Sequence, residues 1–489
     1  MPTRIAFIGA GSIEFTRKLV ADLLTIPEFA NVELAFTDID ARQLHMVAEL
    51  CRRDIAHNRL PAKLIATTDR RTALAGAKYV FCVVRVGGLE AFKTDVEIPL
   101  RYGIDQCVGD TLCAGGLMYA QRGIATILDF CRDIREVAAP DCLLLNYANP
   151  MAMLTWAANV HGGVRCVGLC HGVQHGGHQI AEVLGIPRAE LSYVCAGINH
   201  QTWFVDIRAG GRRVNSTELL AAFEAHPVFS KTEKCRIDVL RRFGVYSTES
   251  NGHLSEYLMW YRKRSGEIGH WCDLSYWIHG ETGGYLRVCN EGRDWFNREF
   301  KKGVHGHPPL TYAVEKRSDE HGAFILEALE TGRPYRGHFN LPNAGIITNL
   351  PDDAIIESPG YVDRHGIHLQ PVGNLPLGCA AVCNQSISVQ RLGVEAAVSG
   401  DDLLLKQAML LDPLVGAVCN PPEVWQMADE MLVAQAKWLP QYTKAVAAAK
   451  KRLKAGPLIK TKPAKGYRLS AASRARRSRA DRLMDLKTR

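Results

Sequence analysis

Glycines after the first apolar run of the chain form a pattern that can bind a nucleotide. The loop Gly9-Ala10-Gly11-Ser12 joins this strand-like run to a segment with helical spacing. Glycines there let backbone N–H groups approach a pyrophosphate. Asp38 ends the second strand-like run, where an acid can bind the adenosine ribose and favours NAD over NADP. Gly87 gives a second glycine turn after the fourth run. These features predict NAD binding, and the alternative is an α/β turn that binds nothing.

Reactive side chains follow three later strand-like runs. They stand in the segments 146–150, 170–172 and 197–200. Strand ends of this kind form the functional edge of a doubly wound sheet. Cys170 and His200 can offer a thiolate and an imidazole to one divalent ion. The alternative for each is a structural role near a strand end.

Strand-like and helical runs alternate over residues 1–195, and this alternation predicts the fold. Strand-like runs span 4–8, 32–38, 63–66, 79–84, 142–146 and 166–170. Helical spacing covers 13–26, 40–58, 117–138 and 174–184. We predict an α/β fold with a doubly wound parallel sheet of the Rossmann type.

A mixed pattern follows over residues 196–455. Strand-like runs such as 203–207 stand among helical runs at 319–331 and 424–451. We expect a C-terminal α+β domain that contributes to the substrate and metal site and to subunit contacts.

Composition and charge exclude several classes of protein. Hydrophobic residues make up 47% and charged residues 22%, as in globular proteins generally. No run of about 18 apolar residues and no secretion signal is present, and the 15 cysteines show no repeated C-x-x-C. We expect a cytoplasmic protein with no membrane contact. The net charge of +8 arises in a basic tail over residues 456–489, predicted to be disordered, so no specific nucleic-acid partner is expected.

Several motifs together resemble glycoside hydrolase family 4, the NAD- and manganese-dependent glycosidases. The likeness covers most of residues 4 to about 440. The motifs are Gly9-x-Gly11-Ser12, Gly109-Asp110-Thr111 with Gly115-Gly116, Asn149-Pro150-Met151, Cys170-His171-Gly172-Val173-Gln174 and Gly197-Ile198-Asn199-His200.

This resemblance implies a fold, a set of ligands and an assembly. The fold is a Rossmann domain of the lactate/malate dehydrogenase type. Cys170 and His200 are implied ligands of Mn²⁺ or another divalent metal, with NAD as cofactor. Asn149, His171 and Asn199 are implied to bind hydroxyl groups of a small α-glycoside, and His171 has a buried structural role as its alternative. A homodimer or homotetramer is expected.

The same resemblance narrows the substrate. Phe92 stands where relatives acting on 6-phosphosugars carry a phosphate-binding arginine, and Lys93 follows it. We therefore expect an unphosphorylated α-glycoside, with an α-galactoside favoured. The branches of the family that act on α-glucosides and on α-galacturonides or α-glucuronides are the alternatives.

The implied reaction is a transient oxidation. NAD takes a hydride from C3, a base removes the C2 proton, the metal stabilises the enediolate, and the aglycone leaves C1; water and the hydride then return. Asp110 matches the acid that assists the leaving group, with a helix N-cap as its alternative. Tyr246 is the predicted base, with His253 and Glu249 as competitors, because Asn251 replaces the aspartate of some relatives.

Two other classes of protein remain as alternatives. One is an NAD-dependent dehydrogenase of the malate/lactate superfamily, which needs no metal. The other is a non-catalytic nucleotide-binding protein. The combination of Asp110, Cys170 and His200 argues against both.

Overall fold

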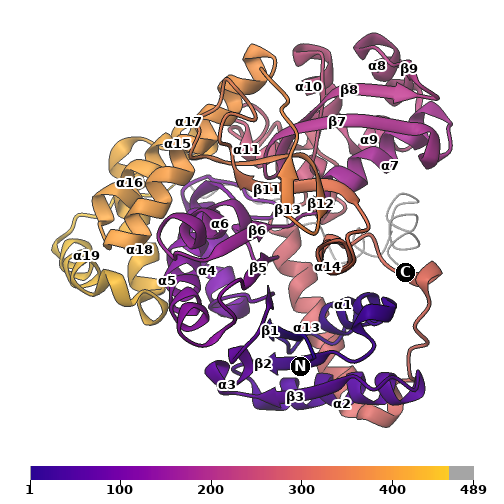
Figure 1. Cartoon of the computed structure of the whole chain (residues 1–489). Coiled ribbons are helices and arrows are strands. Elements are labelled where there is room, and N and C mark those ends of the chain that lie inside the picture. Colours follow the sequence, from indigo (N-terminus) through magenta and orange to yellow (C-terminus); the bar gives the residue numbers. More distant parts are fainter. Residues whose placement is uncertain (1, 462–489) are drawn as a thin grey trace.

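A single sheet of 13 strands runs through the described part of the chain, residues 2–461 of a computed structural model (Figure 1). The main path of the sheet is β10-β8-β7-β12-β11-β6-β5-β4-β1-β2-β3, and β13 and β9 pair with β12 and β8. The strands are β1 (Arg4–Ile8), β2 (Glu33–Thr37), β3 (Lys63–Thr67), β4 (Tyr79–Cys82), β5 (Leu143–Asn146), β6 (Arg165–Gly168), β7 (Leu191–Ile198), β8 (Gln201–Ala209), β9 (Arg212–Arg213), β10 (Tyr246–Ser247), β11 (Tyr335–Pro342), β12 (Ile355–Asp363) and β13 (Gly366–Leu369).

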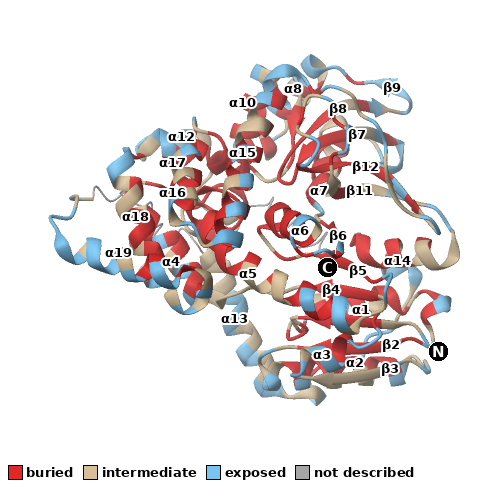
Figure 2. Ribbon diagram, turned by 60° about the vertical axis from the view of Figure 1, so that its left-hand side comes forward, coloured by how far each residue is buried: buried red, intermediate tan, exposed pale blue. Residues whose placement is uncertain are grey.

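Helices cover both faces of this sheet. Figure 2 shows the sheet and the helix sides that face it as buried. The α-helices are α1 (Phe15–Leu23), α2 (Ala41–His57), α3 (Arg70–Leu74), α4 (Gly88–Arg101), α5 (Cys113–Val137), α6 (Met151–Val160), α7 (Gly172–Leu184), α8 (Ser216–Ala225), α9 (Phe229–Thr232), α10 (Lys234–Phe243), α11 (Asn251–Tyr257), α12 (Ile268–Trp271), α13 (Gly284–Lys302), α14 (His321–Thr331), α15 (Leu377–Ser399), α16 (Asp402–Leu411), α17 (Pro413–Val418), α18 (Pro421–Ala434) and α19 (Thr443–Ala455).

The first six strands form the predicted parallel Rossmann sheet, in the order β3-β2-β1-β4-β5-β6. Alternate residues of β1 enter different cores because side chains along a strand point to opposite faces. Ala6 packs with α5 and α6, whereas Phe7 packs with α1, α2 and α14. Phe7 stacks on Phe81 at 4.7 Å between ring centroids. The prediction of a doubly wound α/β fold is confirmed.

The sheet continues into antiparallel strands through two narrow junctions. One register pair, Asn340 with Gly168, joins β11 to β6, and one pair, Glu357 with Gly197, joins β12 to β7. Each junction includes a glycine, Gly168 or Gly197, at which a Cβ has no room. At Gly168, for example, a Cβ would lie 2.1 Å from Met151 Sδ. β7 spans residue 195, so the predicted domain boundary falls inside one continuous sheet and stays a prediction.

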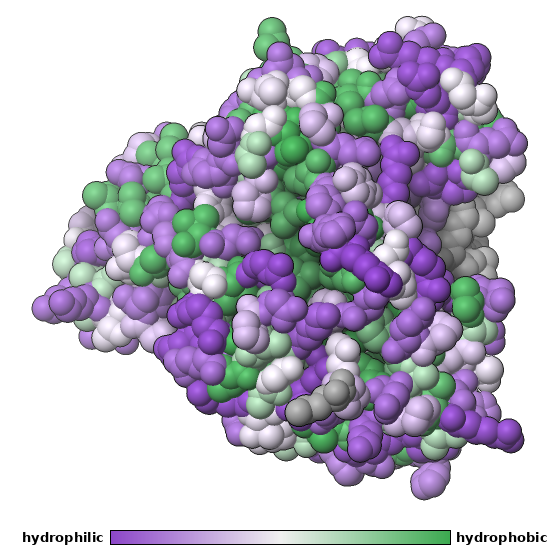
Figure 3. Space-filling model, in the orientation of Figure 1, coloured by the Kyte–Doolittle hydropathy of each residue, from purple (hydrophilic) through white to green (hydrophobic). Residues whose placement is uncertain are grey.

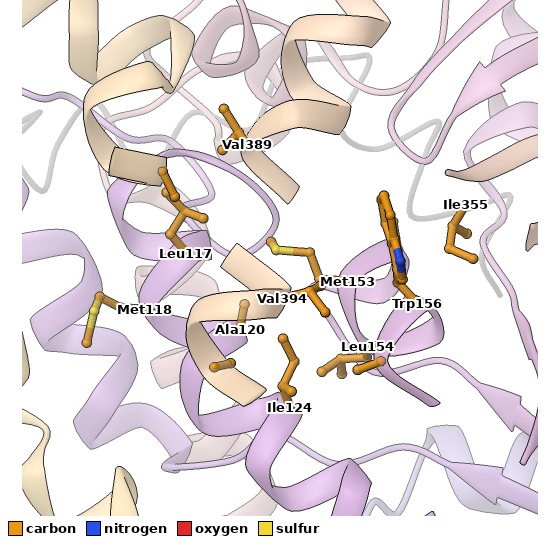
Figure 4. Close-up of a cluster of buried hydrophobic side chains, with 14 of the residues drawn as sticks. Leu117, Met118, Ala120, Ile124, Met153, Leu154, Trp156, Ile355, Val389 and Val394 are labelled. Carbon is orange, nitrogen blue, oxygen red and sulfur yellow. The ribbon is translucent and has the colours of Figure 1, made fainter. Parts of the chain in front are cut away.

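The C-terminal helices α15 to α19 extend the core on the α5 face of the sheet. Leu117 and Ile124 of α5 lie near Met153 of α6 and Val394 of α15 in one apolar cluster (Figure 4). On the face drawn in Figure 3, apolar residues gather toward the centre of the view and polar residues lie around them.

The prediction of one helix over 424–451 is wrong. α18 ends at Ala434, two 3-10 turns over 436–442 follow, and α19 begins at Thr443. Pro440 lies in this break and has no N–H to continue a helix. The side chain of Gln435 binds Arg122 and Asp95 there, so the break also anchors the helices to the core.

Two further predictions concern the basic tail and the absence of a membrane span. Almost all of the predicted basic tail, 456–489, lies outside the described residues. Among residues 2–461, no helix combines the length and the apolar character that a membrane span requires.

A buried ion pair between α4 and α5 gives a stability prediction. Asp95 and Arg122 are both fully buried, and Arg122 Nη1 donates to Asp95 Oδ1 at 3.0 Å. Asp95→Ala would leave a buried guanidinium without its counter-charge, so we expect a loss of about 3 kcal/mol or more in the free energy of unfolding. The exposed pair of Lys93 and Glu97 is the control, and Glu97→Gln should cost less than about 1 kcal/mol in the same denaturant titration. Equal losses would contradict this assignment.

Candidate active site

Three side chains from distant parts of the chain converge into a metal-donor set. Cys170 follows β6, His200 lies in the turn between β7 and β8, and Glu249 lies between β10 and α11. One ligand atom from each lies within 4.8 Å of the other two. The structure therefore brings the two predicted ligands together and adds Glu249, which the sequence suggested only as a competing base. Sulfur, nitrogen and oxygen donors together suit a divalent transition metal.

The environment of Glu249 fits a cation. Its Oε2 is buried without a hydrogen-bond partner and lies 3.8 Å from His200 Nε2. Burial alone would raise the pKa of Glu249, but the imidazoles around it, His200 and His253 foremost, lower the pKa to about 2. Gly172 makes room for this carboxylate, because a Cβ there would lie 2.1 Å from Oε2. A buried, ionised carboxylate whose Oε2 has no hydrogen-bond donor is suited to a cation, and a metal ion held with Cys170 and His200 would fill that role.

Asp110 is joined to this donor set by a single side chain. Thr111 Oγ1 donates to Asp110 Oδ1 at 3.0 Å and lies 3.1 Å from His200 Nδ1. Asn149 Nδ2 donates to Asp110 Oδ2 at 3.2 Å, and Arg85 Nη2 lies 3.5 Å from the same oxygen. The predicted acid, a predicted sugar-binding residue and a predicted metal ligand thus form one connected site.

Asp110 does not cap the helix that follows it. α5 begins at Cys113, its N-cap position is Leu112, and the side chains that accept from its first N–H groups are Asp412 at Cys113 and Gln106 at Gly115. The first turn of α5 packs closely on the Asp110 loop, because a Cβ at Gly116 would lie 2.4 Å from the carbonyl carbon of Thr111. The Gly115-Gly116 pair therefore lets the helix approach the loop.

The other two predicted sugar-binding residues are sequence neighbours of the donor set, since His171 follows Cys170 and Asn199 precedes His200. His171 precedes α7 with a half-exposed side chain, and its Nδ1 lies 3.7 Å from Glu320 Oε1. Asn199 is fully buried, with Nδ2 3.5 Å from Glu357 Oε2. Their roles in sugar binding stay predictions.

Tyr246 is a core residue, and this corrects its prediction as the base. Its ring stacks on Phe223 at 4.3 Å between centroids, and the guanidinium of Arg236 lies over it at 4.3 Å. Its hydroxyl donates to Gln179 Oε1 at 3.2 Å. Burial raises the pKa of Tyr246 well above its usual range. A side chain held in this way among core residues is unsuited to taking a proton from a substrate.

His253, a competing base in the sequence, lies beside the donor set. Its ring centroid is 4.9 Å from that of His200, and Ser250 Oγ lies 2.7 Å from its Nδ1. Burial, together with the charge of His200, lowers the pKa of His253 to about 4. The ring is therefore neutral at pH 7, and Nε2 is the nitrogen left for a further contact.

The predicted cofactor residues gather at the carboxyl ends of β1, β2 and β4. Gly9 has a φ of +87°, and a Cβ there would lie 2.8 Å from Val84 Cγ1. The N–H of Gly11 donates to Asp38 Oδ2 at 2.8 Å, and Ser12 Oγ accepts from Phe15 N at 3.2 Å at the start of α1.

Two more features complete this edge of the sheet. Gly87, with a φ of +80°, precedes α4. Ile39, directly after Asp38, is fully exposed. Close glycine backbones, a helix N-terminus and an exposed apolar side chain beside an acid fit a dinucleotide.

Comparison with known proteins agrees with this geometry. The model "Family 4 glycosyl hydrolase" matches residues 4–186, and the model of its C-terminal domain matches residues 195–415. The chain is 63% identical over 452 residues to an α-galactosidase of Rhizobium meliloti (strain 1021), covering 92% of each chain. It is 32% identical to an α-galactosidase of Bacillus subtilis (strain 168), covering 90% of this chain and 99% of that one.

A solved structure shows the same architecture. It is a 6-phospho-α-glucosidase from gut microorganisms in complex with NAD and glucose-6-phosphate. It superposes with a TM-score of 0.73 at 25% identity and covers 90% of this chain and 99% of that one.

The donor set gives a prediction about metal binding. Cys170→Ser, His200→Gln and Glu249→Gln should each weaken the binding of Mn²⁺ at least about tenfold, because each removes one ligand. Equilibrium dialysis of the reduced protein measures this. Cys166→Ser, which alters a buried cysteine of β6 outside the donor set, is the matched control. Unchanged Mn²⁺ affinity in all three variants would remove the metal assignment.

Proposed function

Because the chain belongs to glycosyl hydrolase family 4, we propose that it hydrolyses unphosphorylated α-galactosides with bound NAD and a divalent metal, Mn²⁺ first among the candidates. One observation carries the proposal: the Cys170–His200–Glu249 donor set lies one side chain away from Asp110. The two α-galactosidase relatives, similar over most of their length, support the choice of sugar.

The surroundings of the fourth strand support an unphosphorylated substrate. Phe92, at the position of the expected phosphate-binding arginine, is fully buried and packs against the Arg85 guanidinium at 4.8 Å. The Lys93 side chain is 63% exposed and lies 3.9 Å from Glu97. Neither residue is therefore placed to bind a phosphate group in a buried sugar site.

The chain's own residues divide the work of the reaction. When bound, NAD would accept a hydride, and the metal would act as a Lewis acid that stabilises negative charge. Cys170, His200 and Glu249 would hold the metal. Gly9, Gly11, Ser12, Asp38 and Gly87 would hold NAD.

Proton transfer is assigned to two residues beside the donor set. The carboxyl of Asp110 would deliver a proton to the leaving oxygen, and Asn149 and Thr111 orient it. His253 replaces Tyr246 as the group that takes the C2 proton, because its ring contacts that of His200. Glu249 is a less suitable base, since it is needed as a ligand.

Assembly and compartment follow from the same proposal. All 15 cysteines are free, and a cysteine ligand works only when reduced, so we place the protein in the cytoplasm. A homodimer or homotetramer is the assembly that family membership supports.

The activity prediction is a three-part requirement. Purified protein should release nitrophenol from 4-nitrophenyl α-galactoside only when NAD, Mn²⁺ and a thiol reductant are all present, without net formation of NADH. Absorbance at 400 nm and at 340 nm, about the maxima of the two products, measures both quantities. No release from this substrate or from the α-glucoside and α-galacturonide analogues would overturn the proposal. Net NADH would favour a dehydrogenase.

The assignment of the base is tested separately. His253→Gln should lower kcat by about 10²- to 10⁴-fold, the usual contribution of a general base, with NAD affinity and Mn²⁺ affinity kept. His226→Gln is a control, because His226 lies outside the donor set, 3.7 Å from Glu182. A loss of less than about tenfold in the His253 variant would contradict the assignment.

A further inference from the structure

We propose that Glu256 is a positioning residue that fixes the acid Asp110 by binding the backbone of the loop before it. The proposal rests on the proposed function, because it assumes that Asp110 protonates the leaving group. Glu256 contacts neither Asp110 nor the donor set directly. Its effect on the reaction would therefore pass through the main chain.

Three successive N–H groups converge on the Glu256 carboxylate. Its Oε2 accepts from Cys107 N at 2.7 Å and from Val108 N at 3.1 Å, and its Oε1 accepts from Gly109 N at 2.9 Å. Glu256 is fully buried. Each of its two carboxylate oxygens accepts at least one backbone N–H, so the three bonds together hold residues 107–109 in one conformation. A buried carboxyl group with three donors is thus a strong clamp on this loop.

The clamp ends immediately before the acid. Gly109, the last residue bound by Glu256, has a φ of +66° and precedes Asp110. On the other side of the loop, Gln106 Oε1 accepts from Gly115 N at 2.9 Å. Arg262 Nε donates to the carbonyl of Asp105 at 2.8 Å. These two bonds fix the start of the loop and its contact with α5. A shift of residues 107–109 would therefore move Asp110, the residue that follows them.

α11, the short helix that carries Glu256, also reaches the metal donors. Glu256 and His253 both belong to α11, as does Tyr257, whose hydroxyl lies 3.3 Å from His200 Nδ1. α11 therefore contacts the acid loop through Glu256 and a metal ligand through Tyr257. This arrangement sets the distance between the acid and the donor set.

Substrates with different leaving groups separate positioning from general structural support. Nitrophenolate is a stable anion and leaves without a proton, whereas methoxide needs one. A displaced acid should therefore slow methyl α-galactoside far more than 4-nitrophenyl α-galactoside. A partly unfolded or loosened enzyme should lose activity on both alike.

The test compares Glu256→Gln with the wild type on these two substrates. The amide is nearly isosteric but turns an NH₂ group toward backbone N–H groups, so it breaks the clamp. We expect kcat/KM to fall at least about tenfold more for the methyl glycoside than for the nitrophenyl glycoside. Asp110→Asn should show the same pattern. The double variant should lose no more on the methyl glycoside than Asp110→Asn alone, because both changes affect one step.

Matched controls keep the outcome decisive. Asp22 is another buried carboxylate that accepts a backbone N–H, from Ser318 at 2.9 Å, but it lies on α1. Asp22→Asn should show no discrimination between the substrates. Should Glu256→Gln fail to fold, Glu256→Asp keeps the charge with a shorter reach and should show the same discrimination to a smaller degree.

Equal loss on both substrates in the Glu256 variants, or no loss, would overturn the proposal. Inactive wild-type protein would instead count against the proposed function itself.

Discussion

The burial of one carboxylate is the constraint on which this site depends. Glu249 lies in the interior beside a thiol and an imidazole, and its Oε2 has no hydrogen-bond partner. An ionised carboxylate without a partner is costly in a protein interior. A divalent ion with Cys170 and His200 as further ligands would remove that cost. The narrow junctions of the sheet belong to this arrangement, because β11 and β12 stand between β6 and β7 and each joins one of them at a single register pair, just before Cys170 and His200.

From this centre, hydrogen bonds extend to the groups that would move protons. Thr111 connects His200 to Asp110, and α11 approaches both through Tyr257 and Glu256. Such a network fixes the position of Asp110 relative to the donor set without direct contact between them. Preorganisation of this kind is what allows charge to develop in a reaction with little rearrangement of the site.

Local patterns in the sequence predicted most of the Rossmann half and two of the three side chains of the Cys170–His200–Glu249 donor set. The glycine loop at residues 9–12 and the strand ends at Cys170 and His200 are local signals, and the structure places them as expected. Tyr246 and Glu249 are only three residues apart, so the sequence could not show which one faces the site. That depends on the pairing of β10 with β8, which sends Tyr246 into an aromatic core. Pro440 marks the break between α18 and α19, but helical spacing on both sides of it favours one continuous helix in the sequence.

In the proposed reaction the sugar loses its C2 proton during cleavage, beside the Cys170–His200–Glu249 donor set. Hydrolysis of 4-nitrophenyl α-galactoside in D₂O with NAD and Mn²⁺ tests it directly, with the released galactose analysed by proton NMR and mass spectrometry. We expect deuterium at C2 of the product, because the proton that returns comes from solvent. Galactose that keeps its original hydrogen at C2 would instead indicate direct displacement at C1, with no loss of the C2 proton.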